Sequence, residues 1–282
     1  MEILYMGTAA EERIPGMFCN CELCQRSLKL GGKNIRMRSQ ALIDDTLLID
    51  FGSDTYTNFI REGRTLWDIQ NILLTHSHPD HLSLEVFSSR YHWMSAETTK
   101  YPTIKLYTSA GVIDKIWRVV EARGLEKEMI EKFWEFIPMN FFEPIEIDGY
   151  TVTPLPARHA VPEQAFVFLI EKDGRTLFYG NDTGVFGTEI DEWLANNHKH
   201  IDLLSLDCTK GDYDTPYYGH MSMGQGREIA NRFLKAGVID QTTKLYFNHF
   251  SHGCRMTHEE MVETAKEKYG FKVTYDGFRV EV

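Results

Sequence analysis

Short runs of apolar and β-branched residues recur along the chain, and most of them are bounded by Gly, Asp or Asn. Such runs are typical of strands. We expect strands at residues 2–6, 41–43, 46–50, 69–75, 103–107, 145–147, 150–154, 164–171, 175–179, 201–206, 244–248 and 271–275. Asp173-Gly174 separates two of these runs and predicts a hairpin between them.

Segments with apolar residues at helical spacing alternate with the predicted strands. We expect helices at residues 53–62, 83–93, 109–123, 127–136, 189–196, 222–236 and 257–268. The last segment begins with Thr257, and Glu260 follows three residues later, which is the pattern of a capping box. His258 lies in the first turn of that helix, where we expect a surface residue rather than a ligand.

Each half of the chain contains several predicted strands followed by helices. This order predicts an α/β fold, an αββα sandwich in which two sheets pack face to face with helices outside. No Pro-, Gly- or Ser-rich linker divides the 282 residues, so we expect one domain over residues 1–282. Aromatic residues are frequent between positions 93 and 142, and their helical spacing favours a place in the core. They are Trp93, Tyr101, Trp117, Phe133, Trp134, Phe136, Phe141 and Phe142.

Composition and charge narrow the classes of function. Hydrophobic residues make up 43% and charged residues 25%, as in ordinary globular proteins. The formal net charge of −11 disfavours a large nucleic-acid-binding surface. The chain starts directly with a strand-like run instead of a signal peptide, and no apolar run approaches the roughly 20 residues that span a bilayer. We therefore expect a cytoplasmic protein that binds neither membranes nor large nucleic acids.

Four side chains that can bind metal ions follow the apolar run at residues 69–74. They are His76, His78, Asp80 and His81. Imidazole nitrogen and carboxylate oxygen suit zinc, manganese or iron. The two histidines at positions 76 and 78 leave one side of an extended segment, whereas the other pair follows Pro79, where the chain turns into a helix. This spacing predicts two ligand pairs for two adjacent ions.

The His-x-His-x-Asp-His segment resembles the signature of the metallo-β-lactamase superfamily. Further residues that this resemblance requires follow in order over nearly the whole chain: Asp50 after a strand, His159 in Pro-Ala-Arg-His, Asp182 in Gly-Asn-Asp-Thr-Gly, and His249 after a strand. The resemblance implies the fold of that superfamily and two divalent metal ions. In the implied arrangement, His76, His78 and His159 hold one ion, Asp80, His81 and His249 hold the other, and Asp182 bridges them.

The same resemblance implies a role for Asp50 and a mechanism. Asp50 would orient a ligand imidazole through its ring N–H, although a carboxylate at the end of a strand also caps turns. Two ions held by the cluster, with Asp80 and Asp182 among their ligands, would lower the pKa of a shared water. A metal-bridged hydroxide would then attack phosphorus or a carbonyl carbon.

Three of the five cysteines, Cys19, Cys21 and Cys24, lie within six positions, which is a poor disulfide framework. In a reducing compartment such a cluster more often binds a metal ion, and thiolates favour zinc. The Cys-x-Cys-x-x-Cys placement resembles the branch that contains the cyclic phosphodiesterase associated with carbon–phosphorus lyase and a pyrroloquinoline-quinone biosynthesis protein. This resemblance implies His252 as the fourth ligand of a structural zinc ion, with Cys254 as its competitor.

The resemblance to the phosphodiesterase also implies that His220 is a general acid. Alternatively, His220 caps the helix that follows it. We expect Asp207 to organise its loop rather than bind metal, and we do not expect Cys208 to be a nucleophile. The turn after the first strand departs from the family pattern, because it carries two carboxylates and Arg13, which could change what approaches the metal ions.

Four functions stay open on the sequence. A phosphodiesterase acting on a small phosphate ester, cyclic esters included, is the first hypothesis. The second is a lactone or thioester hydrolase with the same metal centre, and the third is a tRNA-processing nuclease, which the net charge disfavours. The fourth is a non-catalytic metal-binding biosynthetic accessory protein. A redox di-iron protein is disfavoured because His78 stands where those relatives usually carry Glu. Analogy alone suggests a homodimer.

Overall fold

Two mixed sheets form the centre of the molecule, in a computed structural model that describes residues 1–84, 103–213 and 218–282. The first sheet has the strand order β14-β1-β2-β3-β4-β5-β6 and the second β13-β12-β11-β10-β9-β8-β7. The strands of the first sheet are β1 (Glu2–Gly7), β2 (Gln40–Ile43), β3 (Leu47–Ile49), β4 (Asn71–Leu73), β5 (Ile104–Thr108), β6 (Trp134–Pro138) and β14 (Phe278–Glu281). Those of the second are β7 (Ile145–Ile147), β8 (Tyr150–Pro156), β9 (Phe166–Lys172), β10 (Arg175–Gly180), β11 (Leu203–Asp207), β12 (Lys244–Asn248) and β13 (Lys272–Val273).

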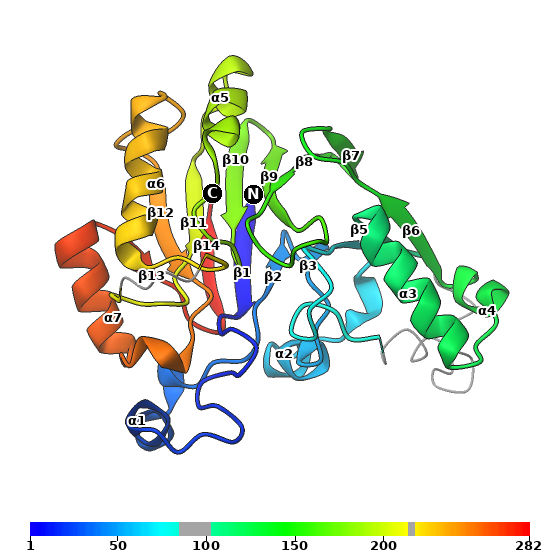
Figure 1. Ribbon diagram of the computed structural model, residues 1–282, viewed down its shortest axis with the longest axis horizontal. Helices are drawn as coiled ribbons and strands as arrows, with labels where there is room; N and C mark the ends of the chain where they lie inside the picture. Colours follow the sequence, from blue (N-terminus) through cyan, green and yellow to red (C-terminus); the bar gives the residue numbers. More distant parts are fainter. Residues whose placement is uncertain (85–102, 214–217) are drawn as a thin grey trace.

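Helices cover the outer face of each sheet (Figure 1). The α-helices are α1 (Glu22–Leu30), which lies at the lower end of Figure 1 below the sheets, α2 (Thr55–Arg61), α3 (Ala110–Ala122), α4 (Lys127–Glu131), α5 (Thr188–Asn196), α6 (Met223–Lys235) and α7 (His258–Thr264). Helices α2, α3 and α4 lie on the side of the first sheet, and α6 and α7 lie on the side of the second. The two termini lie side by side, because β14 pairs with β1 and the Val282 N–H donates to Met1 O.

The alternation of side chains along β1 shows how the layers are held together. Ile3 and Tyr5 belong to the hydrophobic cluster between the sheets, whereas Leu4 and Met6 belong to the cluster beneath α2, α3 and α4. Successive side chains of a strand point to opposite faces, so a strand that is apolar throughout is buried on both faces. A third cluster packs α5 and α6 against the second sheet. The predicted αββα sandwich is confirmed.

Most of the predicted elements are confirmed within about four residues, but two differ more, and some elements were not predicted. The helix predicted at residues 127–136 ends at Glu131, and β6 begins at Trp134, where buried Trp134 is followed by exposed Glu135 in strand alternation. The predicted strand 271–275 is shortened to β13, and the closing strand is β14, which was not predicted. Helix α1 was also not predicted.

The helix predicted at residues 83–93 lies almost entirely outside the described residues, as do Trp93 and Tyr101. Of the other aromatic residues, Trp134 is buried in the core, although in a strand rather than a helix. Trp117 and Phe136 are partly buried and contact each other edge to face, with ring centroids 5.1 Å apart.

The prediction that His258 is a surface residue was wrong. His258 is buried, and its Nδ1 accepts a hydrogen bond from Arg36 Nη2 at 2.9 Å. Arg36 is itself buried and also donates to Thr8 Oγ1 and Thr274 O. A distant arginine that requires an acceptor therefore draws this histidine into the interior.

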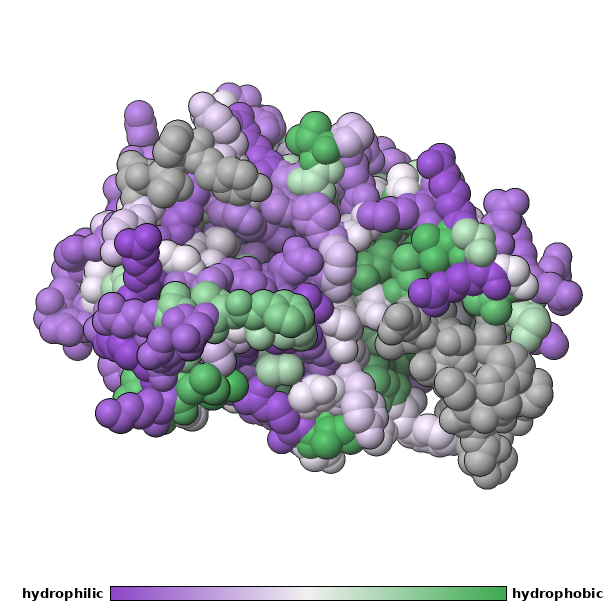
Figure 2. All heavy atoms as spheres, turned by 60° about the horizontal axis from the view of Figure 1, so that its bottom comes forward, coloured by the Kyte–Doolittle hydropathy of each residue, from purple (hydrophilic) through white to green (hydrophobic). Residues whose placement is uncertain are grey.

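Figure 2 brings the lower end of Figure 1 forward and shows a mainly hydrophilic face on which hydrophobic residues form several separate groups. Scattered exposed apolar residues are normal for a globular protein. Among the described residues, no helix combines the length and the apolar character needed to cross a membrane.

Candidate metal centre

The predicted ligands follow the carboxyl ends of strands in both sheets. Asp50 follows β3, the His-x-His-x-Asp-His segment follows β4, His159 follows β8, Asp182 follows β10 and His249 follows β12. Ligand sites of α/β proteins commonly lie at this edge, where loops from several strands converge.

Three of these residues have left-handed backbone conformations directly after their strands. The φ angles of Asp50, Asp182 and His249 are 66°, 50° and 61°. For residues other than glycine, such a conformation is uncommon and costs of order 1–3 kcal/mol. The nearby position 52 requires glycine for a different reason, because a Cβ atom there would lie 1.9 Å from Asp80 O. The backbone at this edge is therefore shaped for the site at some expense of stability.

Three groups of side chains that could hold a metal ion share Asp182, and the third consists of Asp182, Asp207, His220 and His249. The first contains His76, His78, His159 and Asp182, and the second contains Asp80, His81, His249 and Asp182; within each group the potential ligand atoms lie within 4.8 Å of one another. Asp182 Oδ2 lies 3.3 Å from His76 Nε2 and 2.9 Å from His81 Nε2. Asp182 Oδ1 lies 3.3 Å from His159 Nε2. The structure thus brings together all seven residues in the grouping that the resemblance implied, with Asp182 common to the first two groups.

The donor atoms of these groups are suited to metal ions. The Nε2 atoms of His76, His81 and His249 are buried, and their contacts with Asp182 do not have the geometry of hydrogen bonds. A buried polar atom without a partner typically costs about 1–3 kcal/mol. Divalent zinc, manganese or iron would satisfy these nitrogens, so the residues present fit such ions.

The charges in the cluster depend on one another. Burial lowers the pKa of His76 to about 4, with the charge of His81 acting in the same direction. Burial acts to raise the pKa of Asp182, but the imidazoles around it, His249 foremost, hold that pKa well below its usual range. The site therefore favours an ionised Asp182 and a neutral His76, whereas neighbouring carboxylates raise the pKa of His81 and of His249 above the ordinary value.

Asp50 lies where its predicted orienting role requires it. Asp50 Oδ2 is 2.7 Å from His81 Nδ1, and Asp50 Oδ1 accepts hydrogen bonds from the backbone N–H and the hydroxyl of Thr75. The bond to Nδ1 leaves Nε2 of His81 directed at Asp182. Thr75 is a residue that the sequence analysis missed; its position beside His76 was the only signal available.

A second carboxylate, Asp207, organises the loop beside the cluster. Its Oδ1 accepts hydrogen bonds from the backbone N–H of Thr209 and of Met221, as expected for a loop-organising residue. Its Oδ2 lies 3.2 Å from His220 Nδ1 and 3.3 Å from His249 Nδ1. Asp207 therefore orients the ring of a predicted ligand and the ring of the predicted general acid.

His220 lies next to the Asp182 carboxylate, with Nδ1 3.1 Å from Asp182 Oδ1. Burial lowers its pKa, but the carboxylates of Asp207 and Asp182 outweigh burial and raise the pKa to about 11. These two carboxylates therefore favour the protonated form of the ring. The alternative that His220 caps α6 is not supported, because Ser222 is the N-cap residue and forms a capping box with Gln225.

A hollow of about 410 Å³ opens beside His220. Its described lining consists of Thr209, Lys210, Tyr213, His220, Ser251, Gly253 and Arg255. Lys210 and Arg255 bring two positive side chains to this wall, and Lys210 Nζ also donates to Gln225 Oε1 at 3.3 Å. The wall of this hollow therefore carries the imidazole of His220 and two cationic side chains, Lys210 and Arg255.

Cys208 is buried among these elements, and burial raises the pKa of its thiol well above the ordinary value. A thiol of this kind is a poor nucleophile.

The cysteine cluster lies at a separate place, where the N-terminal loop meets the loop after β12. The sulfurs of Cys19, Cys21 and Cys24 lie 3.3, 3.6 and 3.6 Å from His252 Nδ1. Gly16 N–H donates to Cys24 Sγ, but burial outweighs this bond and raises the pKa of the Cys24 thiol to about 12. The hydrogen bond with His252 lowers the pKa of Cys21 to about 6. The structure brings His252 to the three sulfurs and does not place Cys254 among them.

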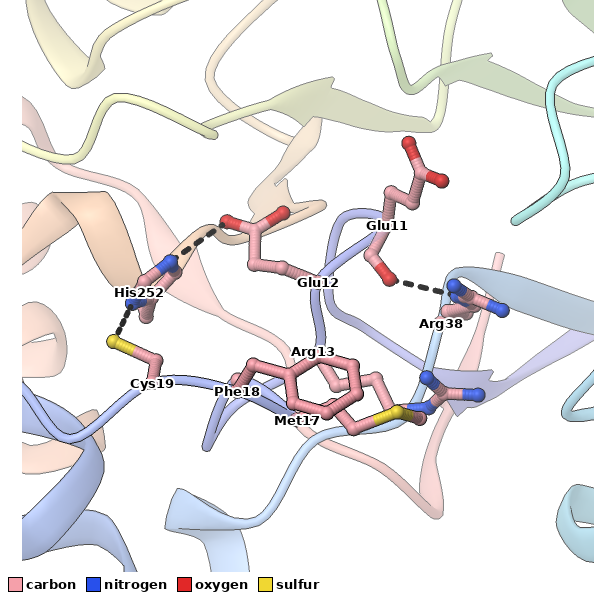
Figure 3. A pocket seen from close by; sticks show the side chains of 9 residues that line it. Glu11, Glu12, Arg13, Met17, Phe18, Cys19, Arg38 and His252 are labelled. Atoms are coloured by element: carbon pink, nitrogen blue, oxygen red, sulfur yellow. Dashed lines mark hydrogen bonds and ion pairs between the residues drawn. The ribbon is translucent and has the colours of Figure 1, made fainter.

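Figure 3 shows how His252 lies between Cys19 on one side and Glu12 on the other. Glu12 Oε1 is 3.7 Å from His252 Nε2 and also accepts a hydrogen bond from Ser251 Oγ. Arg13 forms an ion pair with Asp54. These residues line a hollow of about 420 Å³, and none of the seven clustered ligands is among its described lining residues. Within the unusual turn, Glu12 thus contacts the cysteine cluster, whereas Arg13 pairs with Asp54.

Comparisons with known proteins agree with this geometry. Residues 46–250 match the family described as the beta-lactamase superfamily domain. A UPF0173 metal-dependent hydrolase of Pyrococcus abyssi (strain GE5 / Orsay) is 27% identical over 167 residues, which cover 56% of this chain and 58% of that protein.

Two solved structures are similar over essentially the whole chain. One is a diphosphatase from the PhnP family, with a TM-score of 0.75 and 22% identity, covering 100% of this chain and 97% of that one. The other is Zn(2+)-bound PqqB from Methylobacterium extorquens, with a TM-score of 0.71 and 17% identity, covering 100% of both chains. At these identities the likeness establishes the fold.

Proposed function

The chain belongs to the beta-lactamase superfamily, and from this premise we propose that it is a metal-dependent hydrolase of a small phosphate diester, cyclic esters included. The family match covers the segment from β3 to the loop after β12, which carries all seven clustered residues. The description of the Pyrococcus abyssi relative as a metal-dependent hydrolase and that of a structural neighbour as a diphosphatase support this proposal.

The observation that carries the choice of substrate class is the position of His220. Asp207 holds the ring through Nδ1, so Nε2 would donate the proton to the leaving oxygen. Lys210 and Arg255 line the same hollow, where they would stabilise an anionic ester. A neutral lactone or thioester would gain less from these two charges, so the hollow favours a phosphate ester.

The metal ions complete the proposal. His76, His78 and His159 would hold one ion, Asp80, His81 and His249 the other, and Asp182 would contact both. Two divalent ions of zinc, manganese or iron would supply Lewis acidity and a lowered pKa for water. Cys19, Cys21, Cys24 and His252 would hold a structural zinc ion, because a closed set of four ligands leaves no position for substrate.

The proposal predicts a leaving-group-dependent defect in a His220→Ala variant. Loss of a general acid typically costs about 10²–10⁴-fold in rate when the leaving oxygen requires a proton. We therefore expect kcat for 2′,3′-cyclic AMP, which releases an alkoxide, to fall by about this factor. Hydrolysis of bis(p-nitrophenyl) phosphate should fall less, because nitrophenolate leaves without protonation. Metal content, measured by plasma mass spectrometry, should not change.

An exposed histidine provides the control, since His200→Ala should leave both activities and the metal content unchanged. Hydrolysis of thioesters or lactones alone by the wild type would overturn the choice of a phosphate ester. Full metal loading without turnover of any ester would overturn the hydrolase proposal and favour a metal-binding accessory protein.

A further inference from the structure

Ser77, which lies between His76 and His78, is held by a side chain from a distant part of the chain. The Glu163 carboxylate accepts two hydrogen bonds from Ser77, one from the backbone N–H at 2.7 Å and one from the hydroxyl at 2.5 Å. Ser77 is only 5% exposed, so water competes weakly for these bonds. One carboxylate thus fixes both the backbone and the side chain of the residue between two predicted ligands.

Glu163 lies on the loop between β8 and β9, four residues after His159. Its backbone N–H donates to Ala160 O at 2.8 Å, which closes the turn that follows His159. Glu163 therefore joins the two chain segments that supply the three histidines of the first ligand group. The two segments also contact each other directly, because His78 Nδ1 lies 3.0 Å from His159 Nε2.

Lys115 on α3 reaches the same serine from the helical layer. Its Nζ donates to Ser77 Oγ at 2.5 Å and to Ser77 O at 3.3 Å. The serine hydroxyl therefore accepts a bond from a cation while it donates a bond to a carboxylate. Charge-assisted bonds of this kind are about twice as strong as neutral ones, so the two charged side chains restrict the serine from both sides.

From these contacts we propose that Glu163 is a positioning residue for the first metal ion, with Lys115 as its charged counterpart. Glu163 sets the separation between His78 and His159 without providing a ligand atom. The inference rests on the proposed function in one respect, namely that the first ligand group binds a divalent ion. Replacement of a residue that orients metal ligands typically lowers metal affinity about 10–100-fold.

The test titrates the metal-free protein with Co²⁺ alone, followed by visible absorption and by competition with a chromophoric chelator. Thiolate charge-transfer bands separate Co²⁺ bound at the cysteine cluster from Co²⁺ bound at the histidine cluster. Glu163→Gln retains the size of the side chain but only one acceptor oxygen, so it loses one of the two bonds from Ser77. We expect one of the two ions in the histidine cluster to bind about 10–100-fold more weakly and the other to bind as in the wild type.

Two further variants separate positioning from general stability. Glu163→Asp keeps both acceptor oxygens on a shorter side chain and should recover part of the affinity. Glu171 lies on β9, and its carboxylate accepts two hydrogen bonds from Lys199 Nζ, at 2.8 and 2.9 Å. Because Glu171→Gln removes this carboxylate, it is the matched control. It should bind both ions as the wild type does.

The outcomes distinguish the two proposals. Fewer than two Co²⁺ ions in the histidine cluster of the wild type would overturn the proposed function. Two ions in the wild type, bound with the same affinities by Glu163→Gln, would overturn the positioning role. An equal weakening of both ions in Glu163→Gln, together with a lower free energy of unfolding, would also overturn it, because a merely structural role predicts that result.

Discussion

Buried Arg36 and His258 show how a single pair of residues links stability to pH. Burial, reinforced by the charge of Arg36, lowers the pKa of His258 to about 4, although Glu259 opposes this effect. Imidazole in an unfolded chain has a pKa of about 6.5. The unfolded state therefore binds more protons than the folded state between these two values, so the folded state loses stability as the pH falls from about 6.5 to 4.

We predict that a His258→Asn variant loses this part of the pH dependence. Asn Oδ1 can take the place of Nδ1 as the acceptor for Arg36 but does not titrate in this range. Between pH 7.5 and pH 5, the wild type should lose about 2 kcal/mol more free energy of unfolding than the variant. Urea denaturation of both proteins at the two pH values measures the difference. Equal losses would show that His258 is not held neutral in the folded state.

At the scale of single elements, the N-terminus of α7 is held by reciprocal hydrogen bonds. The Glu260 N–H donates to Thr257 Oγ1, and the Thr257 N–H donates to Glu260 Oε2. We predict that Thr257→Ala destabilises the fold by about 1 kcal/mol, the usual effect of removing an N-cap hydroxyl. Urea denaturation checks the value, and the metal content should not change.

The serine variant tests the cause of that loss. Thr257→Ser retains the hydroxyl and should recover most of the stability, apart from the contribution of the buried methyl group. If Thr257→Ser were as unstable as Thr257→Ala, the loss would reflect packing of the methyl group rather than the cap.

At the scale of the whole molecule, the cysteine cluster joins the N-terminal loop to the loop after β12. The N-terminal loop and the loop after β12 also exchange backbone hydrogen bonds, from Ala10 N to Phe250 O and from Phe250 N to Thr8 O. A zinc ion held by Cys19, Cys21, Cys24 and His252 would cross-link segments more than 220 residues apart, as the numbering shows. Such an ion stabilises the folded state because the unfolded chain lacks a preformed site.

We predict that a Cys21→Ser/Cys24→Ser variant contains one zinc ion fewer per chain than the wild type and has a lower Tm. Added zinc should raise the Tm of the wild type more than that of the variant, because the variant retains only the histidine cluster as a zinc site and binding to the folded state stabilises it. Metal analysis and thermal denaturation measure both effects. The control is Cys254→Ala, which should retain the zinc ion because Cys254 lies outside the cluster. Loss of zinc from this control would make Cys254 the fourth ligand.

The sequence by itself determined most elements of the fold and nearly all of the candidate ligands. Burial on one or both faces imposes a local period on each strand and helix, so elements such as β12 and α6 can be read from their own residues. The His-x-His-x-Asp-His segment is equally local. His159, Asp182 and His249 were predicted only through the resemblance to the metallo-β-lactamase superfamily, since each of them alone resembles an ordinary residue.

Only the tertiary structure decided which distant residues meet. Glu163 and Lys115 converge on Ser77, Asp207 joins His220 to His249, and Arg36 draws His258 into the core. No local pattern marks such pairs, because each contact depends on where packing places two separate elements. The same reason explains β14, which alternates over only four residues and whose place is set by pairing with β1. Hydrophobic periodicity specifies which face a residue buries, and the packing of the two sheets specifies which residue it contacts there.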